Sequence, residues 1–489
     1  MNSPRVCLLL TATLVATAAL SAISPAAFAK KDSPTMSVMT PATGVASRSD
    51  RRPVAGGIYD AKAQTTFITW GGRNQDNYIQ AYDHRLATWT APVLVGLGGG
   101  DSHNYPTIVQ ARDGHLLVFR GLHNRQLVVA RSAQPHSVAG EWTNQVIVAG
   151  DGATYPMPFV AADGSIFVFV RETTRDLDGV TPTDTRPMKY VRSRDNGLTW
   201  QNTFDLTGTK YAIAPTSRSD NMNEIYIGQL RYEAPRFGRP ERVHIVYTLA
   251  GGGPEGHLHD RYHRNIYYTS FTPNDLRFRS ASGADVGTSI DDTDQETHLK
   301  VAHTELQQPN PRTPDYISLV GWTPTGNPFV VWMTTDTTGV LHDHTATWTH
   351  RGWVAHEFAT GVRVRDMEPA GLFSWRVYAT PTTGIDTYLL RAGLPNSSRL
   401  WRYESSLDVP RAVGRIEVIG SHRDPLRILA TGAASGREVP IYYDGDIYVA
   451  GFPCWPATPF TAQALAVRAI DPSGPTGRRA RSRLRRASR

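Results

Sequence analysis

Short runs of alternating hydrophobic and polar residues fill most of the chain, and turn residues separate them. Two segments repeat this pattern closely, YPTIVQARDGHLLVFRG at 105–121 and YPMPFVAADGSIFVFVR at 155–171. In each segment an Asp-Gly turn joins two runs rich in β-branched and aromatic residues, which is the pattern of a β-hairpin. The turn aspartates Asp113 and Asp163 lie 50 residues apart. The pattern predicts an all-β protein that repeats one unit.

Further strand centres continue the repeat along the chain, and tryptophans recur where units end. Their spacing fits four-stranded blades of about 40 to 50 residues plus loops, the unit of a β-propeller. The stretch 200–348 is irregular, so six or eight blades stay open as alternatives. Counting strand centres predicts seven blades, centred near residues 67, 117, 167, 245, 330, 377 and 447.

Two local motifs fall within the predicted propeller. Residues 293–308 contain Thr293 and Glu296 at the spacing of a capping box, which predicts a helix in an insertion rather than a separate domain. The sequence SRDNGLTW at 193–200 matches SxDxGxxW, the Asp-box of sialidase-like propellers. In those proteins the box is a structural turn, so we expect no catalytic role for it here.

The two ends of the chain differ from the repeating body. Residues 1–29 contain an arginine, a short apolar run and Ala27-Phe28-Ala29, the layout of a secretory signal peptide. We predict a flexible linker at 30–52, the propeller at 53–470 and an Arg-rich flexible tail at 471–489. The mature protein is expected to be secreted, soluble and monomeric. Its one cysteine after the signal, Cys454, leaves no intramolecular disulfide.

Net charge argues against a nucleic-acid partner. The chain carries a formal charge of +7, to which residues 1–29 contribute +1 and the tail arginines from 477 onward contribute +7. The body therefore carries −1, too little for a basic binding face. Beyond the signal, no stretch approaches the 18 apolar residues of a membrane span. Nucleic acid and membrane are not expected as partners.

Three hairpins each place a pair of polar side chains equally far from the turn. Residues so placed lie opposite one another in an antiparallel hairpin. Equivalent ends of successive blades converge on one face of a propeller, so these side chains are expected around one depression. The pairs are His103 with His123, Tyr155 with Arg171, and Tyr226 with His244, the last counted from Pro235.

This set of residue types suits abstraction of a proton next to a carboxylate. Negative charge builds on the carboxylate in the transition state, and a bidentate arginine such as Arg171 would stabilise it. The base would be a histidine or a tyrosine activated by a nearby cation, and the same tyrosine could then protonate the leaving oxygen. The residues leave open which of Tyr155 and the histidines is the base. This chemistry requires no metal or other cofactor.

At these residues the sequence resembles the BNR-repeat propeller polysaccharide lyases, which include ulvan lyases and rhamnosyl-glucuronate lyases. The resemblance covers about residues 53–460 and rests on DSHNYP at 101–106, GLHN at 121–124, TYP at 154–156 and IYIGQLRYE at 225–233. It implies β-elimination at a uronate whose O4 carries rhamnose. The catalytic residues that it implies are His103, His123, Tyr155 and Arg171. The implied substrate contacts are Asn104, Asn124, Tyr226, Arg231 and His244.

The substrate expected from this resemblance is a uronate-containing polysaccharide. Because the body shows little positive charge for binding many sulfates, we favour rhamnosyl-(1,4)-glucuronate linkages in plant gum or arabinogalactan. An ulvan lyase acting on sulfated algal chains is the alternative. A sialidase-like hydrolase is a further alternative, although the six side chains include no carboxylate pair. A non-catalytic glycan-binding propeller also stays open.

A histidine-rich segment, GHLHDRYHRN at 256–265, follows the third hairpin. Its residues His257, His259 and His263 have a spacing that could bind a structural metal ion such as Ca²⁺ or Zn²⁺. A polar loop beside the site explains the same residues equally well.

Overall fold

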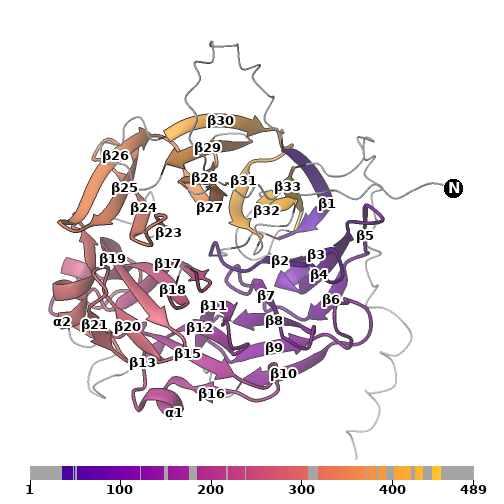
Figure 1. The fold of residues 1–489 in the computed structure, drawn as a ribbon, viewed down its shortest axis with the longest axis horizontal. Helices are drawn as coiled ribbons and strands as arrows, with labels where there is room; N and C mark the ends of the chain where they lie inside the picture. The colour runs from indigo at the N-terminus through magenta and orange to yellow at the C-terminus, as the bar shows by residue number, and fades with distance from the viewer. Residues whose placement is uncertain are drawn as a thin grey trace, which may run out of the picture.

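The computed structural model describes residues 36–452 except 48, 50–51, 122, 148–151, 176–183, 216–217, 237, 307–317, 372, 382–383, 392–400, 420–424 and 433–442. The described strands form seven antiparallel blades around a central axis (Figure 1). The predicted seven-bladed β-propeller is therefore confirmed. The expected signal peptide at 1–29 and the Arg-rich tail at 471–489 lie outside the described residues. No helix in the described part of the chain is long and apolar enough to cross a membrane.

The first three blades follow the chain from its N-terminal side. Blade 1 contains β2 (Gly57–Asp60), β3 (Thr65–Gly71), β4 (Asn77–Asp83) and two short strands that pair with β4, β5 (Thr88–Trp89) and β6 (Val93–Gly96), with the 3₁₀ turn η1 (Arg73–Gln75) between β3 and β4. Blade 2 contains β7 (Pro106–Gln110), β8 (Leu116–Gly121), β9 (Leu127–Arg131) and β10 (Thr143–Ile147). Blade 3 contains β11 (Ala153–Val160), β12 (Ile166–Glu172), β15 (Met188–Ser193) and β16 (Gln201–Asn202), followed by α1 (Thr203–Thr207). The small pair β13 (Thr174–Arg175) and β14 (Asp184–Thr185) extends from β12.

Blade 4 is the largest. It contains β17 (Glu224–Glu233), β18 (Arg242–Gly251), β19 (Tyr262–Thr272), β20 (Arg277–Arg279), β21 (Asp285–Gly287) and β22 (Lys300–Ala302), with the 3₁₀ turn η3 (Gly253–Glu255) between β18 and β19. Blade 5 contains β23 (Leu319–Trp322), β24 (Pro328–Thr335), β25 (Leu341–Thr349) and β26 (Gly352–Thr360). Blade 6 contains β27 (Val364–Gly371), β28 (Ser374–Ala379), β29 (Ile385–Arg391) and β30 (Trp401–Leu407).

Blade 7 joins the two ends of the described chain and closes the ring. Its strands β31 (Val413–Val418), β32 (Leu426–Gly432) and β33 (Gly445–Gly451) are followed on the outer edge by β1 (Ser37–Ala46), which pairs with β33 (Figure 1). Residues 37–46 had been predicted as part of a flexible linker, and this is wrong. Two register shifts in the pairing of β1 break the alternation of apolar residues, which explains why the sequence pattern missed the strand.

The core is divided among the seven contacts between neighbouring blades. Because successive side chains of a strand point to opposite faces, each strand packs against both of its neighbouring blades. Phe67 of β3 packs in the cluster shared with blade 2, whereas Ile68 beside it packs in the cluster shared with blade 7. Each of the seven clusters of buried residues lies between two adjacent blades. Residues of β1 therefore complete the cluster between blade 7 and blade 1.

The two local motifs differ in outcome. The Asp-box forms a turn after β15, in which the backbone N–H of Gly197 donates to Ser193 Oγ at 2.9 Å, as expected for a structural element. The helix expected at 293–308 is shorter, because α2 (Asp292–Asp294) and the π-helical turn η4 (Gln295–Leu299) lead directly into β22. The capping box also lies two residues earlier than predicted and uses Asp291 and Asp294 in place of Thr293 and Glu296. The short helix is an insertion in blade 4.

Asp343 of β25 is a buried carboxyl group that should make stability depend on pH. Burial raises the pKa of Asp343 to about 8, and backbone N–H groups of Val364 and Val362 oppose this only in part. Between the unfolded pKa of about 4 and the folded pKa, the folded state holds one proton more, so stability falls as pH rises, by about 1.4 kcal/mol per pH unit at most. We expect Asp343→Asn to be stabilised relative to the wild type at pH 8 and much less so at pH 5, as measured by urea unfolding. An equal difference at both pH values would contradict this.

Candidate functional site

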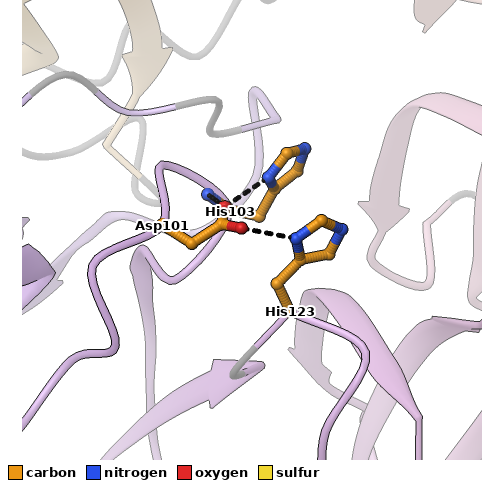
Figure 2. A group of neighbouring side chains, drawn as sticks. All are labelled: Asp101, His103 and His123. Carbon is orange, nitrogen blue, oxygen red and sulfur yellow. Dashed lines mark hydrogen bonds and ion pairs between the residues drawn. The ribbon is translucent and has the colours of Figure 1, made fainter. Parts of the chain in front are cut away.

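A carboxylate holds two histidines together at one end of the blade 2 hairpin. Asp101 and His103 lie in the loop before β7, and His123 follows β8. Nδ1 of His103 lies 2.5 Å from Oδ1 of Asp101, and Nδ1 of His123 lies 2.6 Å from Oδ2 (Figure 2). The two imidazole rings stack with centroids 4.0 Å apart. The predicted closeness of the two histidines is confirmed, and all three side chains are partly exposed.

The neighbouring asparagines support the loops around this pair. Asn104 is buried, and its Oδ1 accepts a hydrogen bond from the backbone N–H of His123 at 2.7 Å. Asn124 has a left-handed backbone (φ 58°), and its Oδ1 accepts from the Thr154 hydroxyl of blade 3 at 3.2 Å. Both residues, which the family resemblance implies as substrate contacts, have hydrogen bonds that fix the protein around the histidines.

Tyr155 is placed beside the histidines by an irregularity in β11. Its φ is 58°, in the region that L-residues rarely adopt, and the pairing of β11 with β12 shifts register at this point, so that Thr154 rather than Tyr155 lies opposite Arg171. The Tyr155 ring lies 5.5 Å from the His103 ring, centroid to centroid. Backbone strain of this kind persists where the surrounding structure enforces it, and it is concentrated at functional sites.

Two arginines contact the Tyr155 ring. The guanidinium carbon of Arg171 lies 4.6 Å from the centroid of that ring, and that of Arg52 lies 4.3 Å from it. Arg52 belongs to the segment before β2, which had been predicted as linker. The same two guanidinium groups also contact the Tyr226 ring, at 4.7 and 5.5 Å. The structure therefore concentrates two positive charges on a pair of phenols.

Arg171 is more deeply buried than the sequence suggested. Its side chain is 1% exposed, and its Nε and Nη1 have no hydrogen-bond partner among the described residues. Burial alone would lower the pKa of Arg171, but electrostatic interactions with Tyr226, Tyr155 and Glu224 raise it overall, so the group stays charged. The expected bidentate contact with a substrate carboxylate does not fit this burial. The Arg171 guanidinium instead places a positive charge against the rings of Tyr155 and Tyr226.

Tyr226 completes this cluster from β17. Burial raises the pKa of the Tyr226 phenol well above its usual range, against the opposing effect of Arg171. The group therefore stays protonated and is suited to donate a hydrogen bond rather than to act as a base. Its ring also contacts His263 edge-on, with centroids 5.1 Å apart.

His244 and Arg231 lie elsewhere, which corrects the predicted pairing of Tyr226 with His244. Tyr226 lies opposite Thr248, and His244 lies opposite Arg231, because the β17–β18 pairing contains a bulge and turns later than Pro235. His244 is fully buried against Trp322, and burial lowers its pKa to about 4. Arg231 pairs with Asp366 at 2.8 Å.

Arg231 lines a cavity at the centre of the propeller, on the side of the inner hairpin turns. This cavity has a volume of about 660 Å³ and includes residues of the innermost strand of every blade. The turn-proximal Gln110 and Val160 also line it, whereas His103, His123 and Tyr155 do not. Arg231 and His244 are therefore not brought together with the histidine pair.

The histidine-rich segment does not gather its histidines around one centre. Nδ1 of His259 lies 2.8 Å from buried Glu224, Nε2 of His263 lies 2.6 Å from Asp260, and Nδ1 of His257 lies 3.2 Å from Asn223. Each histidine thus has a separate partner. The segment forms polar contacts next to Tyr226 rather than a common set of metal ligands.

Asp101, His103 and His123 are the metal-ligand type residues that lie close together in the described part of the chain, with candidate ligand atoms within 4.8 Å of one another. The contacts of 2.5 and 2.6 Å are hydrogen-bond distances. The geometry is that of a carboxylate bound to two imidazoles.

Asp101, Arg52 and Glu224 are functional candidates that the sequence analysis missed. Asp101 stands two residues before His103. An aspartate at this spacing often accepts a hydrogen bond from the backbone two residues on, and this is the signal in the sequence that points to Asp101. Arg52 lies in a non-repeating segment, and Glu224 begins an apolar strand. Neither has a local signal in the sequence, because the residues that they contact lie far from them along the chain.

Sequence comparison finds similarity to known ulvan lyases over part of the chain. The chain is 23% identical over 240 residues to "Ulvan Lyase-PL25" of Pseudoalteromonas sp. (strain PLSV), covering 42% of this chain and 44% of that protein. It is 21% identical over 252 residues to an ulvan lyase of Alteromonas sp. (strain LOR), covering 45% and 47%. The chain thus aligns with less than half the length of these curated relatives.

Solved structures share the fold over a larger part of the chain. A PL25 ulvan lyase superimposes with a TM-score of 0.65 and 16% identity over 84% of this chain and 95% of that one. The same kind of enzyme bound to -[GlcA(1-4)Rha3S]- gives a TM-score of 0.63 at 15% identity, covering 84% and 95%. Polysaccharide lyase Uly1 gives 0.56 at 10% identity, covering 85% and 98%.

The family model of BNR repeat-containing proteins matches residues 65–360, which is more than half of the chain. This region runs from β3 of blade 1 to β26 of blade 5 and contains His103, His123, Tyr155, Arg171 and Tyr226. The chain belongs to the BNR repeat-containing family.

Proposed function

We propose that the protein is a polysaccharide lyase that breaks, by β-elimination, the C4–O4 bond of a uronate whose O4 carries rhamnose. The observation that carries this proposal is the histidine pair on Asp101, which lies beside a Tyr155 held over a buried cation. This arrangement combines a base, an acid and positive charge at one place, as elimination next to a carboxylate requires. Similarity to ulvan lyases supports the same reaction class.

An ulvan-type chain is the substrate that we propose first. One similar solved structure is described as bound to -[GlcA(1-4)Rha3S]-, and both curated relatives are ulvan lyases. These comparisons favour ulvan as the substrate. The low charge of the body had instead favoured plant gum. Net charge is a weak guide here, because it averages the whole surface and does not report cations such as Arg52 that gather at the site.

In the proposed mechanism, His103 removes the proton from C5 of the uronate through Nε2. The electron pair of the C5–H bond forms the C4=C5 double bond, the C4–O4 bond breaks, and the Tyr155 phenol donates its proton to the leaving oxygen. An imidazole with a lone pair at Nε2 can accept a proton and a phenol can donate one, which suits these two roles. His103 is chosen over His123 because its ring contacts both His123 and Tyr155.

Two arginines and one phenol are placed to stabilise the negative charge that develops on the uronate. Arg171 and Arg52 place positive charge next to Tyr155, and Tyr226 remains a hydrogen-bond donor. Because both arginines are at most 4% exposed, water screens their charge weakly. Their field therefore favours the negatively charged transition state.

Ultraviolet absorbance tests the proposal directly, because the C4=C5 double bond is conjugated with the carboxylate. The mature protein is incubated in parallel with ulvan, gum arabic and a sialoside. We expect absorbance to rise with ulvan. A rise with gum arabic alone, together with free rhamnose, would move the substrate to the plant-gum linkage. Sugar release without a rise would show hydrolysis and reject the lyase mechanism, and no reaction at all would favour a glycan-binding propeller.

Arg52 should contribute measurably although it lies outside the repeated strands. A cation over an aromatic ring contributes about 0.5–2 kcal/mol, so Arg52→Met is expected to lower kcat/KM by about 3- to 30-fold. Arg85→Met serves as the control, because Arg85 is an exposed residue of blade 1 that pairs with Asp83. If the two variants have the same activity, Arg52 does not act on the site.

A further inference from the structure

We infer that Asp101 is a positioning residue that holds His103 and His123 in one tautomer and directs Nε2 of both rings away from itself, into the site. The effect of these tautomers on catalysis rests on the proposed function. The tautomers themselves do not depend on it.

The protonation state of Asp101 determines the tautomers. Burial raises the pKa of this carboxyl group, but hydrogen bonds from His103 and His123 lower it more, so that it lies well below its usual range. An ionised carboxylate can only accept hydrogen bonds. Nδ1 of each histidine must therefore carry the proton that is donated to Asp101. Nε2 of a neutral ring is then left with a lone pair, and Figure 2 shows the second nitrogen of each ring on the side away from Asp101.

Charge divides the roles of the two histidines. Two imidazolium ions in stacked rings would repel each other. One carboxylate compensates one positive charge, so the stacked pair is most stable with one ring neutral and the other protonated. The pair then offers a lone pair at one Nε2 and an N–H donor at the other. A single Asp101 thereby provides both a base and a donor for the uronate.

The loop that carries the pair is folded by the same carboxylate. The backbone N–H of His103 donates to Oδ1 of Asp101 at 2.9 Å, which closes a turn over three residues. In Asp101→Asn, the amide oxygen can still accept from this N–H and from one ring. The amide nitrogen, however, is a donor, and it requires the other imidazole to accept at Nδ1. The substitution is therefore expected to preserve the loop and to reverse one tautomer.

The test measures tautomers and activity separately. Protein labelled with ¹⁵N-histidine is studied by NMR as wild type, Asp101→Asn and Asp113→Asn, with signals assigned from His103→Gln and His123→Gln. Asp113 is the matched control, because it lies at the opposite end of the same hairpin and pairs with Arg131. In the wild type we expect both rings to be protonated at Nδ1. In Asp101→Asn we expect one ring to change to the Nε2–H tautomer, and in Asp113→Asn we expect no change.

Kinetics provide the second readout. Asp101→Asn is expected to lower kcat by about 10²–10⁴-fold, the range of acid–base catalysis, with little change in KM. An Nε2–H tautomer for neutral His103 or His123 in the wild type would overturn the inference, whether or not the variant folds. Unchanged tautomers and unchanged kcat in a folded Asp101→Asn would also overturn it. If the tautomers behave as expected while the wild type eliminates no uronate, the positioning role stands and the proposed function fails.

Discussion

Tyr155→Phe is expected to reduce kcat for elimination by about 10²–10⁴-fold while leaving KM nearly unchanged. The substitution removes one hydroxyl group, which in the proposed mechanism donates the proton to the leaving oxygen. It keeps the aromatic ring that lies between His103 and the two arginines. Initial rates of absorbance increase over a range of ulvan concentrations would separate kcat from KM.

Tyr190→Phe is the matched control for this loss. Tyr190 belongs to the same blade, is fully buried, and has a hydroxyl without a hydrogen-bond partner in the described part of the chain. Its removal should therefore leave the elimination rate unchanged. A Tyr155→Phe enzyme as active as the control would show that the phenol transfers no proton and would shift both roles to the histidines.

The sequence predicted the elements that repeat. The hairpins around Asp113 and Asp163 share one pattern, and each spans two antiparallel strands, although the second shifts register next to Tyr155. Residues placed symmetrically about a short turn must meet, which is why His103 and His123 were found. Seven strand centres were enough to count the blades, although position 447 lies in the third strand of its blade and not in the second.

The sequence failed where the backbone departs from regular pairing. In blade 4 a later turn placed His244 opposite Arg231, and a bulge between Ile227 and Gln229 shifted the pairing beyond it, so that Tyr226 lies opposite Thr248. A change of this kind cannot be read from residue counts, because one inserted residue alters every later pair. Arg52 was missed for a different reason. Arg52 lies in the segment before the first blade and contacts Tyr155 of blade 3. Contacts between distant segments leave no periodic signal in the sequence.

Arg171→Met is expected to lower kcat by about 10²–10³-fold, the cost of removing one preorganised group that stabilises developing charge. The side chain is buried beneath Tyr155 and Tyr226, so the loss should fall on kcat more than on KM. Arg171→Lys should restore little of it, because a lysine ammonium is a compact charge and cannot reproduce the planar guanidinium over two rings.

Removal of a buried cation also affects folding, and Arg186→Met separates this effect from catalysis. Arg186 is buried as well, and its Nε lies 3.4 Å from the same Glu224 that interacts with Arg171. Both variants leave Glu224 with one fewer positive neighbour, so both should unfold at lower urea concentration than the wild type. Arg171 differs in contacting both tyrosine rings. If folded Arg186→Met lost as much kcat as folded Arg171→Met, the loss would follow from the disturbed carboxylate. A selective loss in Arg171→Met would locate the catalytic charge beneath Tyr155.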